Sequence, residues 1–256
     1  MSKKYLGDEI DIHAGGEDLV FPHHENEIAQ SEAANGKPFA RYWMHNAFLN
    51  IDNKKMSKSA GNFFTVRDIV AKYDPQVVRF FMLSAHYRSP LNFSYELMEA
   101  AKNGLDRIRT AVTNLNFLLE KAEDREKSQE EIKLLEEAAG FAAKFDEAMD
   151  DDLNTADAIA AIFELVKFIN TNTSADNSAA YIRELLNEIK ELSDVCGLIV
   201  EKKEEMLDSS VEALIEERQA ARKAKNFARA DEIRDELLAK GIILEDTREG
   251  VKWKRA

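Results

Sequence analysis

Apolar side chains recur at three- and four-residue steps between residues 97 and 196, and this periodicity constrains the fold more than any other feature. Such spacing places the apolar residues on one face of an α-helix. Four stripes of this kind follow one another: Leu97, Ala101, Leu105, Ile108, Val112, Leu115 and Leu119; Ile132, Leu135, Ala139, Ala142, Phe145 and Met149; Ile159, Ile162, Val166 and Ile169; and Ile182, Leu185, Ile189, Leu192 and Cys196. Four helices that each carry one apolar face predict a packed bundle.

The composition agrees with a helical protein. Only 10 glycines and 4 prolines occur in 256 residues, and 32% of the residues are charged. Cys196 is the single cysteine, which excludes an internal disulfide and fits a reducing compartment. No apolar run approaches the ~20 residues that span a bilayer, and residues 1–9 lack the apolar core of a signal peptide. We therefore expect a cytoplasmic, soluble protein with no membrane partner.

The first part of the chain has a different pattern. "EIDIHAGG" alternates briefly and ends on glycines, as a strand that enters a tight loop does. "FPHHENEIAQSEAANG" then predicts a helix that closes at Gly36. "RYWMHNAFLNID" is aromatic and apolar, which predicts a buried strand. Strand, helix and strand indicate part of an α/β domain, with too few strands for a complete parallel sheet.

The last part of the chain predicts a small separate module. Residues 201–210 are charged and carry no stripe, so we expect a linker. Two short helices are predicted over residues 211–225 and 227–240, the second ended by Gly241, and a hairpin that turns near Gly250 follows. The formal net charge of the chain is −13, but residues 218–229 contain basic and no acidic side chains. The module is thus electrostatically distinct from the acidic body.

The predicted fold class is mainly α, with partial α/β structure at the start and a small α+β module at the end. We predict the following division: residues 1–64, the end of an α/β domain; residues 65–200, the helical bundle; residues 201–210, the linker; and residues 211–256, the terminal module.

The string "NKKMSKSAGN" places lysines and serines side by side between two structured elements. Ammonium groups and hydroxyls suit a phosphate ligand, although a solvated lysine loop would have the same composition. Residues 55–59 read KMSKS, which is letter for letter the signature of the class I aminoacyl-tRNA synthetases. The chain resembles that class at this point.

The segment "HAGGEDLVFPHHENE" carries a second set of candidate ligands. Gly15 and Gly16 allow a ligand to approach the backbone closely, and Asp18 can accept hydrogen bonds from ribose hydroxyls. His23 and Glu27 are four residues apart, a spacing that suits either two zinc ligands or an ordinary surface pair. The whole segment is similar to the HGGGxDLxFPHHxxE stretch of cysteinyl-tRNA synthetases, from which Ala14 is a mild departure.

The basic segment of the terminal module has two interpretations. Arginines and lysines around Phe227 suit contact with RNA phosphates and unstacked bases, or they form a solvated helix face with Phe227 in the core. The segment resembles the anticodon-recognition module of cysteinyl-tRNA synthetases, which ends in a basic hairpin with a tryptophan, here Trp253. "HYRSPLNFS" and "DDLNTADAIAAIFEL" resemble the stem-contacting helical domain of the same family.

This resemblance implies a Rossmann-like class I catalytic domain, followed by a stem-contact bundle, that joins cysteine to tRNA(Cys) with ATP and Mg²⁺. It implies that Lys58, assisted by Lys55, stabilises charge on the departing pyrophosphate, while Gly61 lets the loop move. It implies these further roles: ATP binding by Gly16, Asp18, Lys55, Met56, Ser57, Lys58 and Ser59; a cysteine pocket lined by His13; two of four Zn²⁺ ligands from His23 and Glu27; and anticodon reading by Arg222, Phe227, Asp231, Arg234 and Asp246.

Two features of the family are missing from this sequence. No HIGH motif occurs, and the two cysteines that complete the family's zinc site have no counterpart, because Cys196 lies far along the helical region. We therefore expect a C-terminal fragment that is inactive alone, binds zinc weakly and keeps affinity for tRNA(Cys), most simply as a monomer. The alternatives are a related ligase that joins cysteine to an amino sugar, which lacks an RNA-reading tail, and a non-catalytic tRNA-binding fragment.

Overall fold

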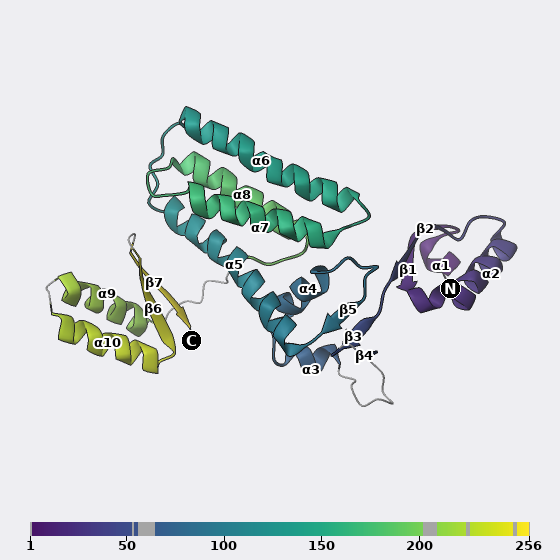
Figure 1. Ribbon diagram of the computed structural model, residues 1–256, viewed down its shortest axis with the longest axis horizontal. Helices are drawn as coiled ribbons and strands as arrows, with labels where there is room; N and C mark the ends of the chain where they lie inside the picture. Colours follow the sequence, from purple (N-terminus) through teal and green to yellow (C-terminus); the bar gives the residue numbers. More distant parts are fainter. Residues whose placement is uncertain are drawn as a thin grey trace. The chain divides into compact units, whose positions relative to one another are not determined.

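The structure is a computed structural model that describes residues 2–52, 54–55, 65–201, 209–223, 226–247 and 250–255 (Figure 1). The chain separates into two compact units, Met1–Glu201 and Lys202–Ala256. Among the described residues, none of the helices is both long enough and apolar enough to cross a bilayer.

The first unit begins with the predicted strand–helix–strand arrangement. Helix α1 (Ser2–Leu6) precedes β1 (Ile10–Gly16), and two short helical turns, η1 (Glu17–Leu19) and η2 (Val20–His24), lead into α2 (Glu25–Asn35). Gly36 ends α2 with a φ of 64°, a left-handed conformation that glycine adopts without steric cost. Strand β2 (Ala40–Asn46) then returns to pair with β1 in parallel.

The prediction of one buried strand over "RYWMHNAFLNID" is wrong. The segment forms two strands, β2 and β3 (Leu49–Ile51), which belong to different sheets. Side chains of the β1–β2 pair also remain exposed: Ile12 pairs with Tyr42, and they are 59% and 68% exposed. A sheet of two strands presents alternate side chains to opposite faces, and here one face has no covering element among the described residues.

A second sheet connects this region to the helices. Strand β3 pairs in parallel with β5 (Leu91–Phe93) and antiparallel with β4 (Lys54–Lys55). Between β4 and β5 lie α3 (Val66–Val70) and α4 (Pro75–Leu83), capped by the side chains of Thr65 and Asp74. Each cap accepts a hydrogen bond from a backbone N–H that has no partner within its helix.

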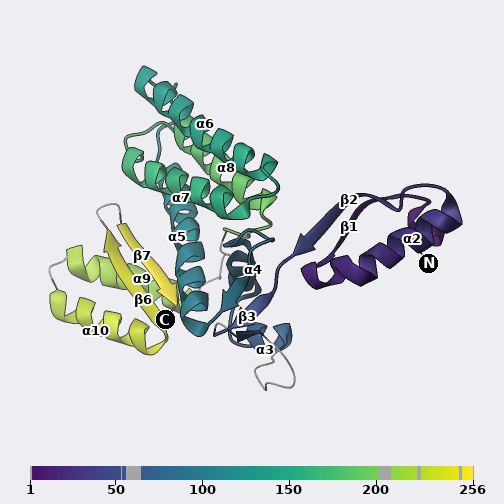
Figure 2. The ribbon, with the colours of Figure 1, turned by 45° about the vertical axis from the view of Figure 1, so that its right-hand side comes forward.

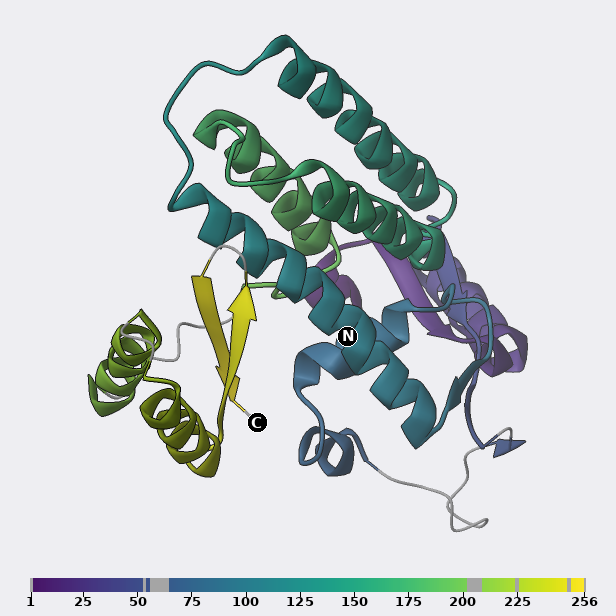
Figure 3. The same cartoon turned by 60° about the vertical axis from the view of Figure 1, so that its left-hand side comes forward.

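The four predicted stripes form four helices: α5 (Tyr95–Leu119), α6 (Gln129–Asp150), α7 (Thr155–Asn172) and α8 (Ala179–Val195). Figures 2 and 3 show α6, α7 and α8 side by side, with α5 extending beyond them toward α4. Each helix begins at a side-chain cap, on Ser94, Ser128, Asn154 and Ser178 respectively. The four helices contribute most of the main core of the unit, which continues into β3, α3, α4 and β5.

The stripes differ in how well they predict burial. Every residue of the third and fourth stripes is buried, including Cys196, whose thiol pKa is raised by that burial. In the first and second stripes Leu97 and Ile132 are 44% and 37% exposed, while their neighbours Met98 and Glu131 are buried. In α6 the difference extends to the middle of the helix, where Ala139 is exposed and Ala138 is buried, so the buried face of α6 is displaced by about one residue from the predicted stripe.

The buried carboxylate of Glu131 joins three segments of the bundle. It accepts hydrogen bonds from the backbone N–H of Ser128 and of Ser178, each at 2.7 Å, and from both guanidinium nitrogens of Arg125 at 3.1 Å. Burial alone would raise the pKa of Glu131, but these hydrogen bonds outweigh it and lower the pKa to about 2. The carboxylate thus stays ionised and links the starts of α6 and α8.

The second unit contains α9 (Ser209–Lys223), α10 (Phe227–Ala239) and the antiparallel hairpin of β6 (Ile242–Thr247) and β7 (Gly250–Arg255). The predicted helices and hairpin are confirmed, although α9 starts two residues earlier than expected. Gly241, with a φ of 74°, ends α10 as predicted. The core of the second unit consists of Ile233, Leu237, Ile242 and Leu244, with Leu214 and Ile215 packed against it.

Candidate functional site

Three histidines gather beside Trp43 of β2: His13 from β1, His24 from η2 and His45 from β2. The rings of His13 and Trp43 are 4.6 Å apart, and His24 lies 5.2 Å from the same indole. His45 stacks on Trp43 at an interplanar angle of 11°. The parallel register brings these residues together, since His13 pairs with Trp43 and Gly15 with His45.

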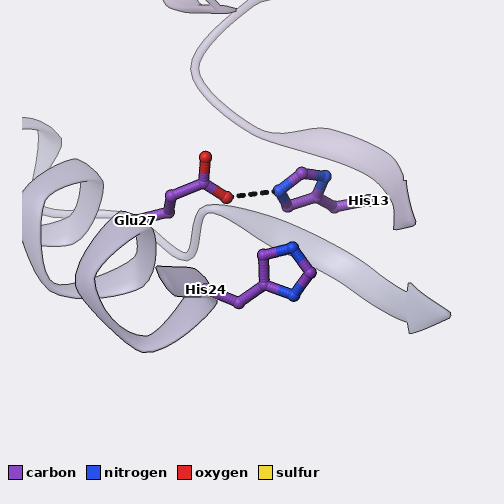
Figure 4. Close-up of side chains that lie close together, drawn as sticks. All are labelled: His13, His24 and Glu27. Atoms are coloured by element: carbon purple, nitrogen blue, oxygen red, sulfur yellow. Dashed lines mark hydrogen bonds and ion pairs between the residues drawn. The ribbon is translucent and has the colours of Figure 1, made fainter. Parts of the chain in front are cut away.

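Glu27 connects this cluster to α2 (Figure 4). Its Oε2 atom lies 2.6 Å from Nε2 of His13, and its Oε1 atom lies 3.5 Å from Nε2 of His23. The hydrogen bond with His13 is the main reason that the pKa of Glu27 is lowered, and it outweighs the opposing effect of burial. The carboxylate is therefore ionised, with one oxygen held by His13 and the other turned toward His23.

His24, the last residue of η2, is buried against β1 and β2. Its Nδ1 atom lies 2.8 Å from Nε2 of His45, so one of these two nitrogens donates and the other accepts. Burial lowers the pKa of His24, and the neighbouring charges of His13 and His45 act in the same direction. A neutral His24 keeps one ring nitrogen able to accept a hydrogen bond or a metal ion.

Two glycines make room for the side chains of this cluster. A Cβ atom on Gly15 would lie 2.7 Å from Cε1 of His24, and a Cβ atom on Gly16 would lie 2.6 Å from a carboxylate oxygen of Asp18. The sequence suggested that glycines here admit a ligand. The structure shows that they admit His24 and Asp18, and thereby fix both side chains beside the end of β1.

The cluster contains one arrangement that fits a metal ion. Ligand atoms of His13, His24 and Glu27 lie within 4.8 Å of one another. Tetrahedral zinc with nitrogen and oxygen ligands separates those ligands by about 3.3 Å. The 3.5 Å between His23 and Glu27 matches one edge of such a site, whereas the 2.6 Å between His13 and Glu27 is a hydrogen bond. The group of three ligand atoms is therefore that of His13, His24 and Glu27, whereas His23 lies near Glu27 alone.

The lone cysteine does not complete this site. Cys196 is buried in the core of the helical bundle, at the C-terminal end of α8. The described part of the chain thus offers the ion nitrogen and oxygen ligands and no sulfur ligand.

The KMSKS string lies only partly within the described residues. Lys55 ends β4, and Thr65 caps α3 nine residues after Met56. The strand before the string is therefore confirmed. Four of the predicted ATP-binding residues and the predicted hinge glycine lie outside the described residues: Met56, Ser57, Lys58, Ser59 and Gly61.

The predicted anticodon residues occupy the second unit. Phe227 begins α10 and is 62% exposed, which rules out the interpretation of Phe227 as a core residue. Asp231 and Arg234 follow at four and seven residues, so all three share one face of α10. Arg222 is exposed on α9, and Asp246 lies in β6, where its side chain is outside the described residues.

The sequence analysis missed His24, His45 and Trp43. The doublet of His23 and His24 was a signal, since only one of two adjacent histidines can face the same side of a helix. The contact of His24 with His45 depends on strand pairing, because the parallel register places His45 opposite Gly15 at the end of β1. The sequence carries no local signal for this contact, since 21 residues separate His24 from His45.

Family models match most of the chain. The class I (C) tRNA synthetase catalytic domain matches residues 1–103, the DALR domain matches residues 144–201, and the cysteinyl-tRNA ligase anticodon-binding domain matches residues 204–253. Curated relatives align with the entire chain: the cysteine–tRNA ligase of Lachnospira eligens is 70% identical, and that of Lachnoclostridium phytofermentans is 63% identical. The chain spans 54% and 56% of the length of these relatives.

Solved structures support the fold. A leucyl-tRNA synthetase from Agrobacterium radiobacter K84, in a ternary complex with tRNA, matches 74% of this chain and 28% of its own with a TM-score of 0.56 and 18% identity. The Mycobacterium tuberculosis methionyl-tRNA synthetase matches 73% of this chain and 40% of its own with a TM-score of 0.53 and 19% identity. At these identities the likeness concerns the fold alone. The alignments at 70% and 63% identity show that the chain belongs to the cysteine–tRNA ligase family of class I aminoacyl-tRNA synthetases.

Proposed function

We propose that this chain serves in the ATP-dependent activation of cysteine to cysteinyl-adenylate and the transfer of cysteine to tRNA(Cys). The observation that carries the proposal is the identity of 54–70% to cysteine–tRNA ligases over the whole chain. The protein would act in the cytoplasm as a monomer, with ATP and Mg²⁺, cysteine and tRNA(Cys) as its partners. Because the chain spans about half the length of those relatives, the full reaction needs groups beyond the ones on this chain.

The nucleotide would lie between the turn after β1 and the KMSKS string. Gly16 and Asp18 stand at the carboxyl end of a parallel strand, where α/β folds bind nucleotides. Lys55 and Lys58, with Met56, Ser57 and Ser59, would contact the triphosphate. As the pyrophosphate departs, the two ammonium groups would stabilise the charge that develops on it.

Cysteine would be recognised beside the histidine cluster. His23 and Glu27 would hold Zn²⁺, and His13 would both fix the Glu27 carboxylate by its 2.6 Å hydrogen bond and line the cysteine pocket. When bound, zinc prefers the soft thiolate of cysteine over the hydroxyl of serine. Glu27 contributes an ionised carboxylate, and its lowered pKa keeps it available as a ligand at acidic as well as neutral pH.

The second unit would read the anticodon. Phe227 offers an exposed ring for base stacking, and Asp231 and Arg234 on the same face of α10 can hydrogen-bond base edges. Arg222 and Asp246 would complete this surface. The match of residues 204–253 to an anticodon-binding domain supports this assignment and disfavours the amino-sugar ligase, which lacks an RNA-reading tail. A non-catalytic tRNA-binding role remains the second candidate for the isolated chain.

Binding of tRNA by the isolated chain tests the proposal. Fluorescence anisotropy should show tighter binding of tRNA(Cys) than of an unrelated tRNA, and Arg222→Ala with Arg234→Ala should weaken it by about 1–3 kcal/mol for each lost base contact. Lys3→Ala with Lys37→Ala is the matched control, because both lysines are exposed and lie outside the helical bundle and the second unit. Equal affinity for the two RNAs would contradict anticodon reading.

The catalytic role is tested in the full-length enzyme that contains this segment. Lys58→Ala should lower the rate of cysteine-dependent ATP–pyrophosphate exchange by orders of magnitude while leaving tRNA affinity intact. An unchanged exchange rate would remove the mechanism assigned to the KMSKS string. The isolated chain should show no ATP–pyrophosphate exchange above a control without protein. Exchange catalysed by the isolated chain would contradict the non-catalytic alternative.

A further inference from the structure

The chain that leaves α8 is held along five consecutive residues before it reaches the second unit. Helix α8 ends at Val195, and the first unit ends at Glu201. Residues 197–201 are therefore the last segment of the first unit, and we call them the exit segment. Each residue of the exit segment is either buried in the main core or bonded to α4, α5 or α8.

The first two residues of the exit segment close α8. Gly197 has a φ of 63°, and its backbone N–H donates to the carbonyl of Asp194 at 2.7 Å. The N–H of Leu198 donates to the carbonyl of Ser193 at 3.0 Å, which completes a common helix-ending motif. A Cβ atom on Gly197 would lie 3.0 Å from the guanidinium of Arg79, so α4 lies close against this turn.

Ile199 is held through its backbone, while its side chain is 60% exposed. Its N–H donates to Oε1 of Gln76 at 2.9 Å, and its carbonyl accepts from Nε of Arg109 at 3.3 Å. Asp74 links these two side chains, because its carboxylate accepts from the Gln76 backbone N–H at 2.9 Å and from the Arg109 guanidinium at 3.0 Å. Helices α4 and α5 thus hold both backbone polar groups of one residue in a closed ring of hydrogen bonds.

The last two residues of the exit segment extend this anchor to the end of the first unit. Val200 is 4% exposed and belongs to the main core, as does Leu198 on the other side of Ile199. Glu201 forms an ion pair with Lys190 of α8, a surface contact of modest strength. The anchored stretch therefore reaches the residue at which the first unit ends.

Helix termination alone does not account for this arrangement. The motif at Gly197 and Leu198 already satisfies the last carbonyls of α8. The next three residues are ordered as well, although fixing the backbone of each residue costs about 1–2 kcal/mol of conformational entropy. The consequence is a fixed point of departure: only residues 202–208 separate the exit segment from α9, which begins at Ser209.

A short connection with a fixed origin matters when one ligand binds both units. The second contact is then intramolecular, and its effective concentration falls as the connection lengthens. Release of the exit segment would lengthen the connection from residues 202–208 to residues 197–208. Effective concentration falls roughly as the −3/2 power of length, so this release would lower it about twofold, and the loss of a fixed direction would lower it further.

We propose that Gln76 and Arg109 are positioning residues, which fix the exit segment so that both units bind one tRNA(Cys) molecule together. The inference rests on the proposed function, since it takes tRNA as the shared ligand. Neither side chain needs to touch RNA or the reacting atoms, because both act through the backbone of Ile199. The exit segment contributes to the affinity for whole tRNA and leaves the affinity of the second unit for an anticodon stem–loop unchanged.

Gln76→Leu in the full-length enzyme that contains this segment tests the inference. It should raise the KM for tRNA(Cys) in aminoacylation about two- to fivefold and leave kcat unchanged. Cysteine-dependent ATP–pyrophosphate exchange without tRNA and the affinity for an isolated anticodon stem–loop should stay at their wild-type values. Amide hydrogen exchange at Ile199 should accelerate, because its N–H loses the Gln76 acceptor, and this measurement reports the anchor directly.

Two further variants separate positioning from folding. Gln76→Glu keeps an acceptor oxygen beside Arg109 and should return the KM to nearly the wild-type value. Insertion of about five glycine and serine residues after Glu201 lengthens the connection while every anchoring contact remains, so it should raise the KM as Gln76→Leu does. Gln30→Leu is the matched control, because Gln30 is exposed in α2, outside the helical bundle and the second unit.

Each other outcome overturns the inference. Weaker binding of the stem–loop by Gln76→Leu, or slower pyrophosphate exchange, would show that this substitution disturbs folding rather than position. An unchanged KM in either Gln76→Leu or the insertion variant would remove the positioning role, while charging of tRNA(Cys) by the wild-type enzyme would leave the proposed function standing. If the wild-type enzyme does not charge tRNA(Cys), the proposed function fails and the inference fails with it.

Discussion

The carboxylate of Glu27 lies 2.6 Å from Nε2 of His13, across 14 residues of sequence. This contact joins β1 to α2, and it leaves the other oxygen of Glu27 facing His23. One residue thus combines two functions: it closes the strand–helix unit and presents a charged oxygen where the proposed zinc ion would bind. The fold decides which oxygen of Glu27 contacts His13 and which one faces His23.

The isolated chain should bind Zn²⁺ with a dissociation constant above about 1 µM, because two protein ligands cannot fill a tetrahedral site. Glu27→Gln should weaken this binding further, since a neutral amide is a poorer ligand than an ionised carboxylate. Glu25→Gln on the same helix is the control, because Glu25 is exposed and has no histidine partner among the described contacts. Titration calorimetry measures both, and a sub-micromolar constant for wild type would count against the half-site.

Acid should destabilise the bundle through Glu131. Its pKa is about 2 in the folded protein against 4.5 when unfolded, so its ionised form contributes stability that is fully present above pH 4.5 and is lost as the pH falls toward 2. The shift corresponds to about 3 kcal/mol. Glu131→Gln should lose most of this at pH 7 and flatten the fall in unfolding free energy between pH 4.5 and 2. Urea denaturation at several pH values checks this, with exposed Glu130→Gln as control; parallel curves for wild type and Glu131→Gln would disprove it.

Gly15→Ala should disturb the histidine cluster. The added methyl would lie 2.7 Å from the His24 ring, so that ring must move away from His45 or the strands must separate, at a cost of about 1–3 kcal/mol. Gly140→Ala is the opposite case, because nothing lies within 4 Å of a Cβ atom there and alanine favours the interior of α6. It should stabilise the protein by about 0.5–1 kcal/mol. Thermal unfolding separates the two, and changes of the same sign would refute the packing argument.

The turn between α6 and α7 should depend on Asp152. Its φ is 56°, a left-handed conformation that non-glycine residues rarely adopt, and its carboxylate lies 2.9 Å from the Tyr87 hydroxyl and 2.7 Å from the Arg88 guanidinium. Asp152→Ala should therefore destabilise the bundle by about 1–3 kcal/mol. Asp152→Asn should cost less, because asparagine tolerates this conformation and still accepts from Tyr87. The prediction fails if both variants unfold at the same denaturant concentration.

The helical bundle and the terminal module could be predicted from the sequence because their signals are local. Apolar residues at steps of three and four define a helix face whatever surrounds it, and the stripe from Ile182 to Cys196 is buried throughout. Helix caps such as Asn154 and the glycine stop at Gly241 act within one turn, so they too are visible in the sequence. Burial at the start of α5 and along α6 was predicted less well, because the neighbouring elements decide which face of each helix is covered.

The candidate site depends partly on local sequence patterns and partly on tertiary contacts. The sequence by itself determined the KMSKS string and the four-residue spacing of His23 and Glu27, because these are properties of consecutive residues. Only the tertiary structure decided that His24 and His45 meet at 2.8 Å and that Gln76 holds the backbone of Ile199. Strand register and helix packing bring these residues together over 21 and 123 positions of chain, and no local pattern records which of many possible registers the packed core selects.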